Sequence, residues 1–211
     1  MTMYARTERL ALADLFDEAG PDAPTLCAGW TTRDLAAHLV ARERRPDSGP
    51  GLLIRPLAGY AERVRRGLAS GRSYAELVSL VRDGPPPWSP FGLPRVDAAV
   101  NTVEFFVHHE DVRRAGQEWR PRETDPGLED ALWRRLRAMA RMLVRRVPVG
   151  VELRVEGHAP VLARSADPSV TLRGDASEVV LYLFGRRQVA DVEVEGTDDA
   201  VAALAVAPLG I

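Results

Sequence analysis

The sequence predicts an α+β protein that is helical in its first two thirds and rich in strands afterwards. Up to residue 146, apolar residues recur at helical spacing in successive segments, with polar residues between them. From residue 150 onward, VELRVEG and DVEVEG alternate apolar and charged residues, as half-buried strands do. The period changes at Pro148-Val149-Gly150, so we place a domain boundary there, between residues 1–147 and 148–211.

The helices of the first part have readable starts and stops. One is predicted over 3–19, where a Gly-Pro pair ends it, and a second over 32–45, with Thr31 or Thr32 as its N-cap. Further helices are predicted over 55–69, 73–82, 95–115 and 126–146.

A proline-rich segment, GPPPWSPFGLP at 84–94, interrupts this helical series. Its prolines cannot lie inside a helix, so we predict an extended crossover. Trp88 and Phe91 are expected to pack it onto the bundle.

The second part is short. PVLARS and SVTLRG add two strand candidates, DASEVVLYLFG is typical of a helix closed by Gly185, and a last short helix is predicted over 197–206. A unit of about 60 residues is marginal alone, so we expect it to pack on the first part.

Composition excludes several classes of function. Every basic residue is an arginine, and the net charge of −2 disfavours a general role in binding nucleic acid. A single cysteine, Cys27, rules out an intrachain disulfide. The sequence has no signal-peptide pattern and no apolar run of about 20 residues, so we expect a soluble cytoplasmic protein without a membrane role.

The segment NTVEFFVHHEDVRR, residues 101–114, carries the candidate site. Glu104 and His108 are four residues apart, which places both on one face of a helix. With His38 as the candidate third ligand, two imidazoles and a carboxylate suit Zn²⁺ or another first-row divalent ion, with positions left for water or substrate. The alternative is a buried His bonded to a Glu of its own helix, which is common in proteins without a metal.

Asp111 and His109 are candidates for residues that lie next to the proposed ligands without binding the ion. Asp111 lies one turn after His108 and could orient that imidazole, or it could pair with Arg114 on the helix surface. His109 points about 100° away from its neighbour, so we expect it beside the site or at the surface and not as a ligand.

Three arginines are candidates for binding an anionic substrate. Arg42 and Arg45 follow His38 by four and seven residues, and Arg186 of the second domain could face the cleft. A structural role is the alternative for each. Cys27 is open to three readings, as a small buried apolar residue, a nucleophile or a fourth ligand.

Two patterns carry a resemblance to a known family. W-x-x-x-D-L-x-x-H and E-x-x-x-H-x-x-D resemble those of the DinB-like, mycothiol-dependent maleylpyruvate isomerase superfamily, over most of residues 1–147. Here they are Trp30, Asp34, Leu35 and His38, then Glu104, His108 and Asp111. Residues 150–206 resemble the small sterol-carrier-like C-terminal domain of the same isomerases.

The resemblance implies a four-helix bundle in which His38, Glu104 and His108 bind Zn²⁺. Many DinB-like proteins have a third histidine in place of Glu104, and the glutamate matches the isomerase subgroup. RERRPD at 42–47 resembles an uncharacterised actinobacterial branch described only as metal-binding. Neither RERRPD nor GPPPWSPFG is an isomerase feature.

Two functions therefore stay open. One is a zinc-dependent transferase or isomerase that joins a small-molecule thiol, by resemblance mycothiol, to a small electrophilic substrate. The other is a non-catalytic protein that binds a metal or another ligand. The sequence names no catalytic residue beyond the ligands.

Overall fold

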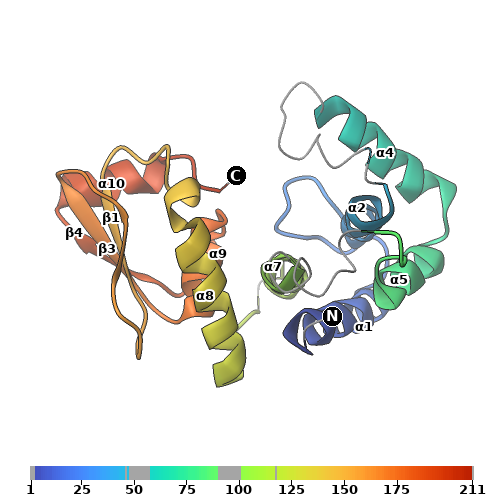
Figure 1. Ribbon diagram of the computed structural model, residues 1–211. Helices are drawn as coiled ribbons and strands as arrows, with labels where there is room; N and C mark the ends of the chain where they lie inside the picture. Colours follow the sequence, from blue (N-terminus) through green and yellow to red (C-terminus); the bar gives the residue numbers. More distant parts are fainter. Residues whose placement is uncertain (1–2, 46, 48–57, 90–100, 117, 211) are drawn as a thin grey trace. The chain divides into compact units, whose positions relative to one another are not determined.

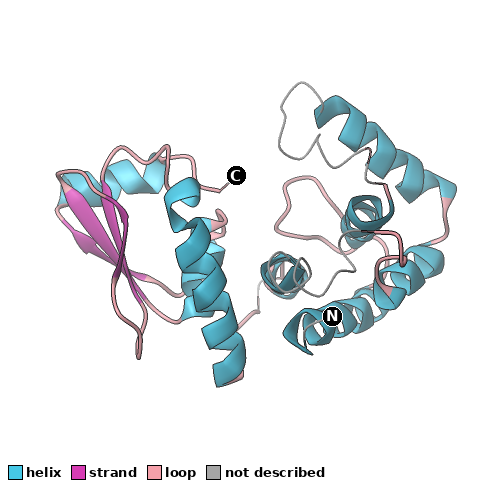
Figure 2. Ribbon diagram, viewed as in Figure 1, coloured by secondary structure: helices cyan, strands magenta, loops and turns pink. Residues whose placement is uncertain are grey.

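The secondary structure confirms the predicted α+β class (Figures 1 and 2). The structure is a computed structural model, and it describes residues 3–45, 47, 58–89, 101–116 and 118–210. Among the described residues, the regular elements up to residue 143 are helices, and strands begin at Gly150, where the sequence places the change of period. None of the helices in these ranges is long and apolar enough to cross a membrane.

The chain divides into two compact units, Met1–Arg120 and Pro121–Ile211. This division lies earlier than the predicted boundary between residues 147 and 148. Helix α8 (Pro126–Leu143) accounts for the difference, because it packs on α9 (Ala176–Leu183) and β2 (Val161–Arg164) in the second unit. The apolar side of α8 therefore packs on elements of the second unit, and the sequence pattern does not identify these partners.

The first unit is built from helices α1 (Met3–Ala19), α2 (Thr32–Arg44), α4 (Ala58–Gly71), α5 (Tyr74–Asp83) and α7 (Thr102–Arg113). Four of them share one hydrophobic core, with α1 packed on α5 and α7, and α2 packed on α5. Helix α4 packs against α2. This arrangement matches the predicted four-helix bundle, with α4 as an addition.

Capping residues fix where the bundle helices begin. Thr31 is the N-cap of α2, as predicted, and its backbone N–H donates to the carboxylate of Asp34 at 3.1 Å. Ser73 caps α5 in the same way, with Glu76 accepting from the Ser73 backbone N–H at 2.8 Å. The start of α2 matters most, because it sets the position of His38.

A buried ion pair joins the helices of the bundle. The guanidinium of Arg9 on α1 donates to Glu43 of α2 at 2.9 Å and to the carbonyl of Val81 on α5 at 3.0 Å. It also lies 4.1 Å from the ring centre of Phe105 on α7. Arg9 thus touches every helix of the shared core, a role that its sequence position does not reveal.

The crossover and its neighbours differ in part from expectation. Trp88 is 63% exposed, so the prediction that it packs onto the bundle is wrong. Phe91 and the proposed helical segment 95–100 lie outside the described residues.

The second unit holds a four-stranded sheet in the order β2-β1-β3-β4. Strand β1 (Gly150–Arg154) pairs in parallel with β3 (Ser169–Arg173), whereas β2 and β4 (Glu193–Gly196) are antiparallel edge strands. The last helix, α10 (Asp198–Val206), packs on β3 and β4. All four predicted strands and both predicted helices of this part are therefore present.

Gly150 is the one position of the sheet where only glycine fits. A Cβ there would lie 2.3 Å from the carbonyl oxygen of Ala166. The tight approach lets the Gly150 N–H donate to the carbonyl of Pro168 at 2.9 Å as β1 begins.

Candidate metal centre

Two helices bring the three predicted ligands together. Helix α2 carries His38, and α7 carries Glu104 and His108 one turn apart. Oε1 of Glu104 lies 3.5 Å from Nε2 of His38 and 3.5 Å from Nε2 of His108. The three donor atoms lie within 4.8 Å of one another, so a histidine 66 residues before Glu104 meets the pair on α7.

The spacing of these atoms fits one metal ion. Two donors bound tetrahedrally at 2.0–2.1 Å from Zn²⁺ lie about 3.3–3.4 Å apart. A separation of 3.5 Å is longer than a usual hydrogen bond between a nitrogen and an oxygen. Both separations are therefore compatible with a single ion shared by the three side chains.

The donors are accessible from one side. The side chains of His38, Glu104 and His108 are 14%, 24% and 12% exposed. Behind them, Asp111 is fully buried and Arg42 nearly so. An ion bound here would keep free positions on the exposed side, as open sites do.

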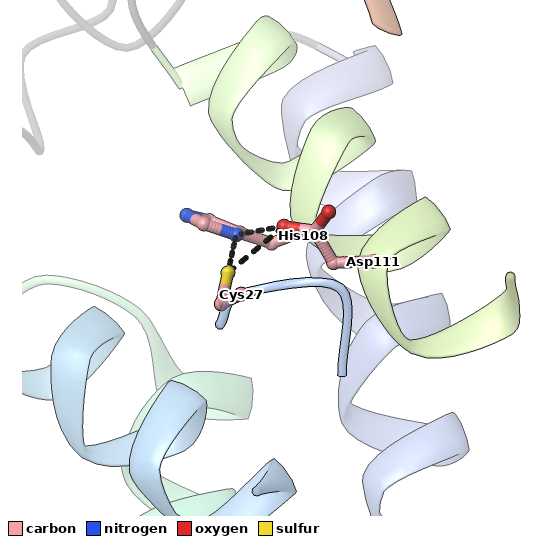
Figure 3. Close-up of side chains that lie close together, drawn as sticks. All are labelled: Cys27, His108 and Asp111. Atoms are coloured by element: carbon pink, nitrogen blue, oxygen red, sulfur yellow. Dashed lines mark hydrogen bonds and ion pairs between the residues drawn. The ribbon is translucent and has the colours of Figure 1, made fainter. Parts of the chain in front are cut away.

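Asp111 contacts the imidazole ring of His108 (Figure 3). Its Oδ2 lies 2.9 Å from Nδ1 of His108, which leaves Nε2 for the candidate ion. With Nδ1–H as the donor, this contact fixes the tautomer that metal binding requires. Asp111 therefore contacts His108, and its role in orienting a metal ligand stays a prediction.

Cys27 completes this hydrogen-bonded group (Figure 3). Its Sγ donates to Oδ2 of Asp111 at 3.2 Å and lies 4.0 Å from Nδ1 of His108. The loop before α2 brings it there, since the backbone N–H of Leu26 donates to the carbonyl of Asp111 at 2.9 Å. Residue spacing could not place Cys27 beside His108, because the contact spans 81 positions.

Cys27, His108 and Asp111 also form a second set of converging donors. This set would use Nδ1 of His108, whereas the first set uses Nε2. The side chains of the first set are partly exposed and their donor atoms are spaced as around one ion, whereas in the second set Asp111 is buried and is a hydrogen-bond partner of His108.

The residues of the W-x-x-x-D pattern form one wall of the site. The ring of Trp30 lies 5.2 Å from that of His38, measured between centres. The guanidinium of Arg65 stacks on Trp30, 4.8 Å from the centre of the indole ring. The same guanidinium pairs with Asp34. The pattern thus supports the position of His38 through packing and charge.

Arg42 is buried beside Glu104 and does not lie on the exposed side of the three donor side chains. Its Nε is 3.3 Å from Oε1 of Glu104, and NH1 donates to Oδ1 of Asn101 at 2.7 Å. Arg42, a candidate for binding an anionic substrate, therefore contacts the carboxylate of a candidate ligand, and a contact with substrate stays a prediction. Because it is buried on α2 beside His38, its guanidinium meets the ligand carboxylate itself.

The other neighbouring candidates lie elsewhere. His109 is buried against α1, with Nδ1 3.0 Å from Glu8, so it faces away from the site that we expected it to border. Arg45 pairs at the surface with Asp47 and Tyr60. Arg186 belongs to the second unit, where NH1 donates to the carbonyl of Phe184 at 2.6 Å.

Electrostatics favour a charged carboxylate at the centre. Burial opposes ionisation of Glu104, but the charge of Arg42 and the two neighbouring histidines outweigh it, so the pKa of Glu104 lies well below the usual value. Burial lowers the pKa of His38. Burial also opposes protonation of His108, yet its bonds to Asp111, Cys27 and Glu104 raise its pKa well above the usual value.

Comparison with known proteins supports the resemblance within the first unit. No curated protein and no solved structure gave a significant match to the chain. A family model does match, over residues 4–84, which include His38 and end before Glu104. The matched family is described as the mycothiol maleylpyruvate isomerase N-terminal domain, and the chain is similar to it over these residues, which are less than half of its length.

Proposed function

We propose that this chain binds a divalent metal, with Zn²⁺ as the expected ion, and acts as a thiol-using transferase or isomerase on a small electrophilic substrate. One observation carries the proposal: Oε1 of Glu104 lies 3.5 Å from Nε2 of both His38 and His108. The family match over residues 4–84 supports mycothiol as the thiol.

The donor set suits this chemistry. A zinc ion supplies a Lewis acid that lowers the pKa of a bound thiol, so that thiolate is available near neutral pH. His38, Glu104 and His108 would hold the ion and leave positions on their exposed side. A closed structural site would need a fourth protein ligand in that place.

The surrounding residues hold the ligands in place. Asp111 fixes the ring of His108 through Nδ1. Arg42 keeps Glu104 charged and holds its carboxylate between the two imidazoles. We expect both residues to act on the substrate only through the ligands.

Thiol binding is tested first, with Co²⁺ as a spectroscopic replacement for zinc. Adding mycothiol to the cobalt-loaded protein should produce a thiolate-to-cobalt charge-transfer band, and S-methylated mycothiol should not. The band should be absent in His108→Ala and present in His158→Ala, a control in the second unit.

Turnover is tested second, by following the absorbance of maleylpyruvate with the zinc-loaded protein and mycothiol. Loss of the substrate band that needs both metal and thiol supports the isomerase reading. If the protein binds metal but no thiol at millimolar concentration, the proposal of a thiol-using enzyme is replaced by that of a non-catalytic metal-binding protein. If thiol binds but neither maleylpyruvate nor other electrophiles react, the catalytic part of the proposal fails.

A further inference from the structure

An arginine-lined cavity lies in the second unit, between the end of α8 and the edge strand β2. Its volume is about 380 Å³, within the range of small-molecule sites. The residues that line it are Arg141, Arg145, Leu162, Ala163, Arg164 and Ser165. Three guanidinium groups therefore surround a cavity whose lining contains no carboxylate.

Two arginines of the same unit that do not line this cavity have glutamate neighbours. Arg154 pairs with Glu152, and Arg173 lies 3.3 Å from Glu195. Within the described part of the chain, no carboxylate pairs with Arg141, Arg145 or Arg164. Three arginines without a carboxylate partner among the described residues therefore line one cavity.

Helix electrostatics explain only part of the cluster. Arg141 is in the last turn of α8 and Arg145 follows it, so both suit the negative end of the helix dipole. Arg164 comes from β2, and its NH1 donates to the carbonyl of Arg145 at 3.3 Å. Its Nε is buried and has no hydrogen-bond partner among the described residues, which leaves a donor unused beside the cavity.

The lining also has an apolar part. Leu162 is 54% exposed, an unusual state for a leucine on a strand, and it lines the cavity beside the arginines. A ligand with an oxyanion at one end and an apolar group at the other would match both parts. Arginine pairs well with phosphate, because its planar group donates two parallel hydrogen bonds.

We infer that this cavity binds a phosphate monoester of a small apolar molecule, with the phosphate on the three arginines and the apolar group on Leu162. The site lies wholly within the second unit. It is therefore independent of the metal-dependent function proposed above.

Calorimetric titration of the full-length protein with phenyl phosphate tests this inference, with inorganic pyrophosphate as a probe of the arginines alone. We expect phenyl phosphate to bind. Arg141→Gln and Arg164→Gln should each weaken binding about tenfold or more, as expected when a charge-assisted contact is lost. Leu162→Ser should weaken phenyl phosphate only.

Two controls separate this site from other causes. Arg173→Gln removes an exposed arginine from the same sheet and should leave both affinities unchanged. His38→Gln disables the candidate metal centre and should also leave them unchanged, so phosphate bound to an ion in the first unit is not counted. If Arg164→Gln does not fold, Arg145→Gln replaces it, because Arg145 is exposed.

The inference is overturned if neither probe binds at millimolar concentration, or if Arg173→Gln weakens binding as much as Arg141→Gln does. Binding of pyrophosphate without phenyl phosphate would also contradict it, since the apolar half of the site would then have no role.

Discussion

At the scale of single residues, the candidate metal centre depends on contacts from three separate stretches of the chain. The pair on α7 could be predicted from its spacing, and His38 from the resemblance. The contacts of Arg42 and Cys27 could not be predicted. A sequence shows that a residue is near a helix end or in a loop, but it does not show which residues its side chain contacts in the fold. Asp111 was predictable because it lies on the same helix as its partner.

Replacing Asp111 by asparagine should weaken metal binding about ten- to a hundred-fold. The neutral side chain keeps the shape of Asp111 but loses the charge that holds Nδ1–H of His108. Competition with a chelator of known affinity measures the change. Glu76→Gln, in the capping box of α5, is the control and should bind metal normally. An unchanged affinity in Asp111→Asn would show that Asp111 does not support the ligand.

Asp175 gives a pH-dependent prediction in the second unit. Burial and the neighbouring carboxylates Glu129, Glu178 and Glu156 raise its pKa. The folded state therefore holds the proton of Asp175 more tightly than the unfolded state. The contribution of this group to stability is fully present below the unfolded pKa of 3.8 and is lost as pH rises through the folded pKa.

Asp175→Asn should accordingly raise Tm at pH 7, because asparagine is an equally good N-cap for α9 and adds no repulsion. The difference in Tm between the variant and the wild type should vanish near about pH 3, where Asp175 is protonated in both the folded and the unfolded state. Thermal unfolding followed by circular dichroism measures it. Asp198→Asn, at the start of α10, is the control and should not raise Tm. A lower Tm for Asp175→Asn at pH 7 would mean that its charge stabilises the fold.

At the scale of helices and strands, periodicity was sufficient to place the described α-helices and strands within a few residues, except for the start of α7, where the predicted residues 95–100 lie outside the described part. Helix α8 was predicted over 126–146 and runs from Pro126 to Leu143. The exposure of Trp88 was not predictable in this way, because a large aromatic side chain shows a capacity for burial and not the presence of a covering partner. The link among the bundle helices through Arg9 was hidden for the same reason.

Removing one partner of the Arg9–Glu43 pair should destabilise the first unit by about 3–5 kcal/mol, because the remaining charge is buried without compensation. The double substitution Arg9→Met with Glu43→Leu should cost less than the two single changes added together. Urea unfolding of the four proteins completes the cycle. Additive effects would show that the two charges do not stabilise each other.

At the scale of the whole molecule, the second unit begins earlier than the change from helix to strand. The apolar stripe of α8 predicts that the helix is buried, but any apolar surface nearby would satisfy the pattern. Its actual partners are α9 and β2, whose sequences lie downstream. A boundary drawn from periodicity alone therefore assigned α8 to the wrong side of the division between the units.

A fragment of residues 121–211 should fold, whereas a fragment of residues 148–211 should not. Without α8, the shorter chain exposes apolar residues of α9, and about 60 residues form only a marginal core. Circular dichroism on heating should show a cooperative transition for the longer fragment alone. Equal transitions in both fragments would show that α8 adds little to this unit.

The central claim is that His38, Glu104 and His108 bind a divalent ion, and metal analysis tests it most directly. The protein is incubated with Zn²⁺, desalted and measured by plasma mass spectrometry. We expect about one ion per chain in the wild type and in His158→Ala, and none in His108→Ala. A wild-type protein without zinc, or a His108→Ala protein that keeps it, would contradict the claim.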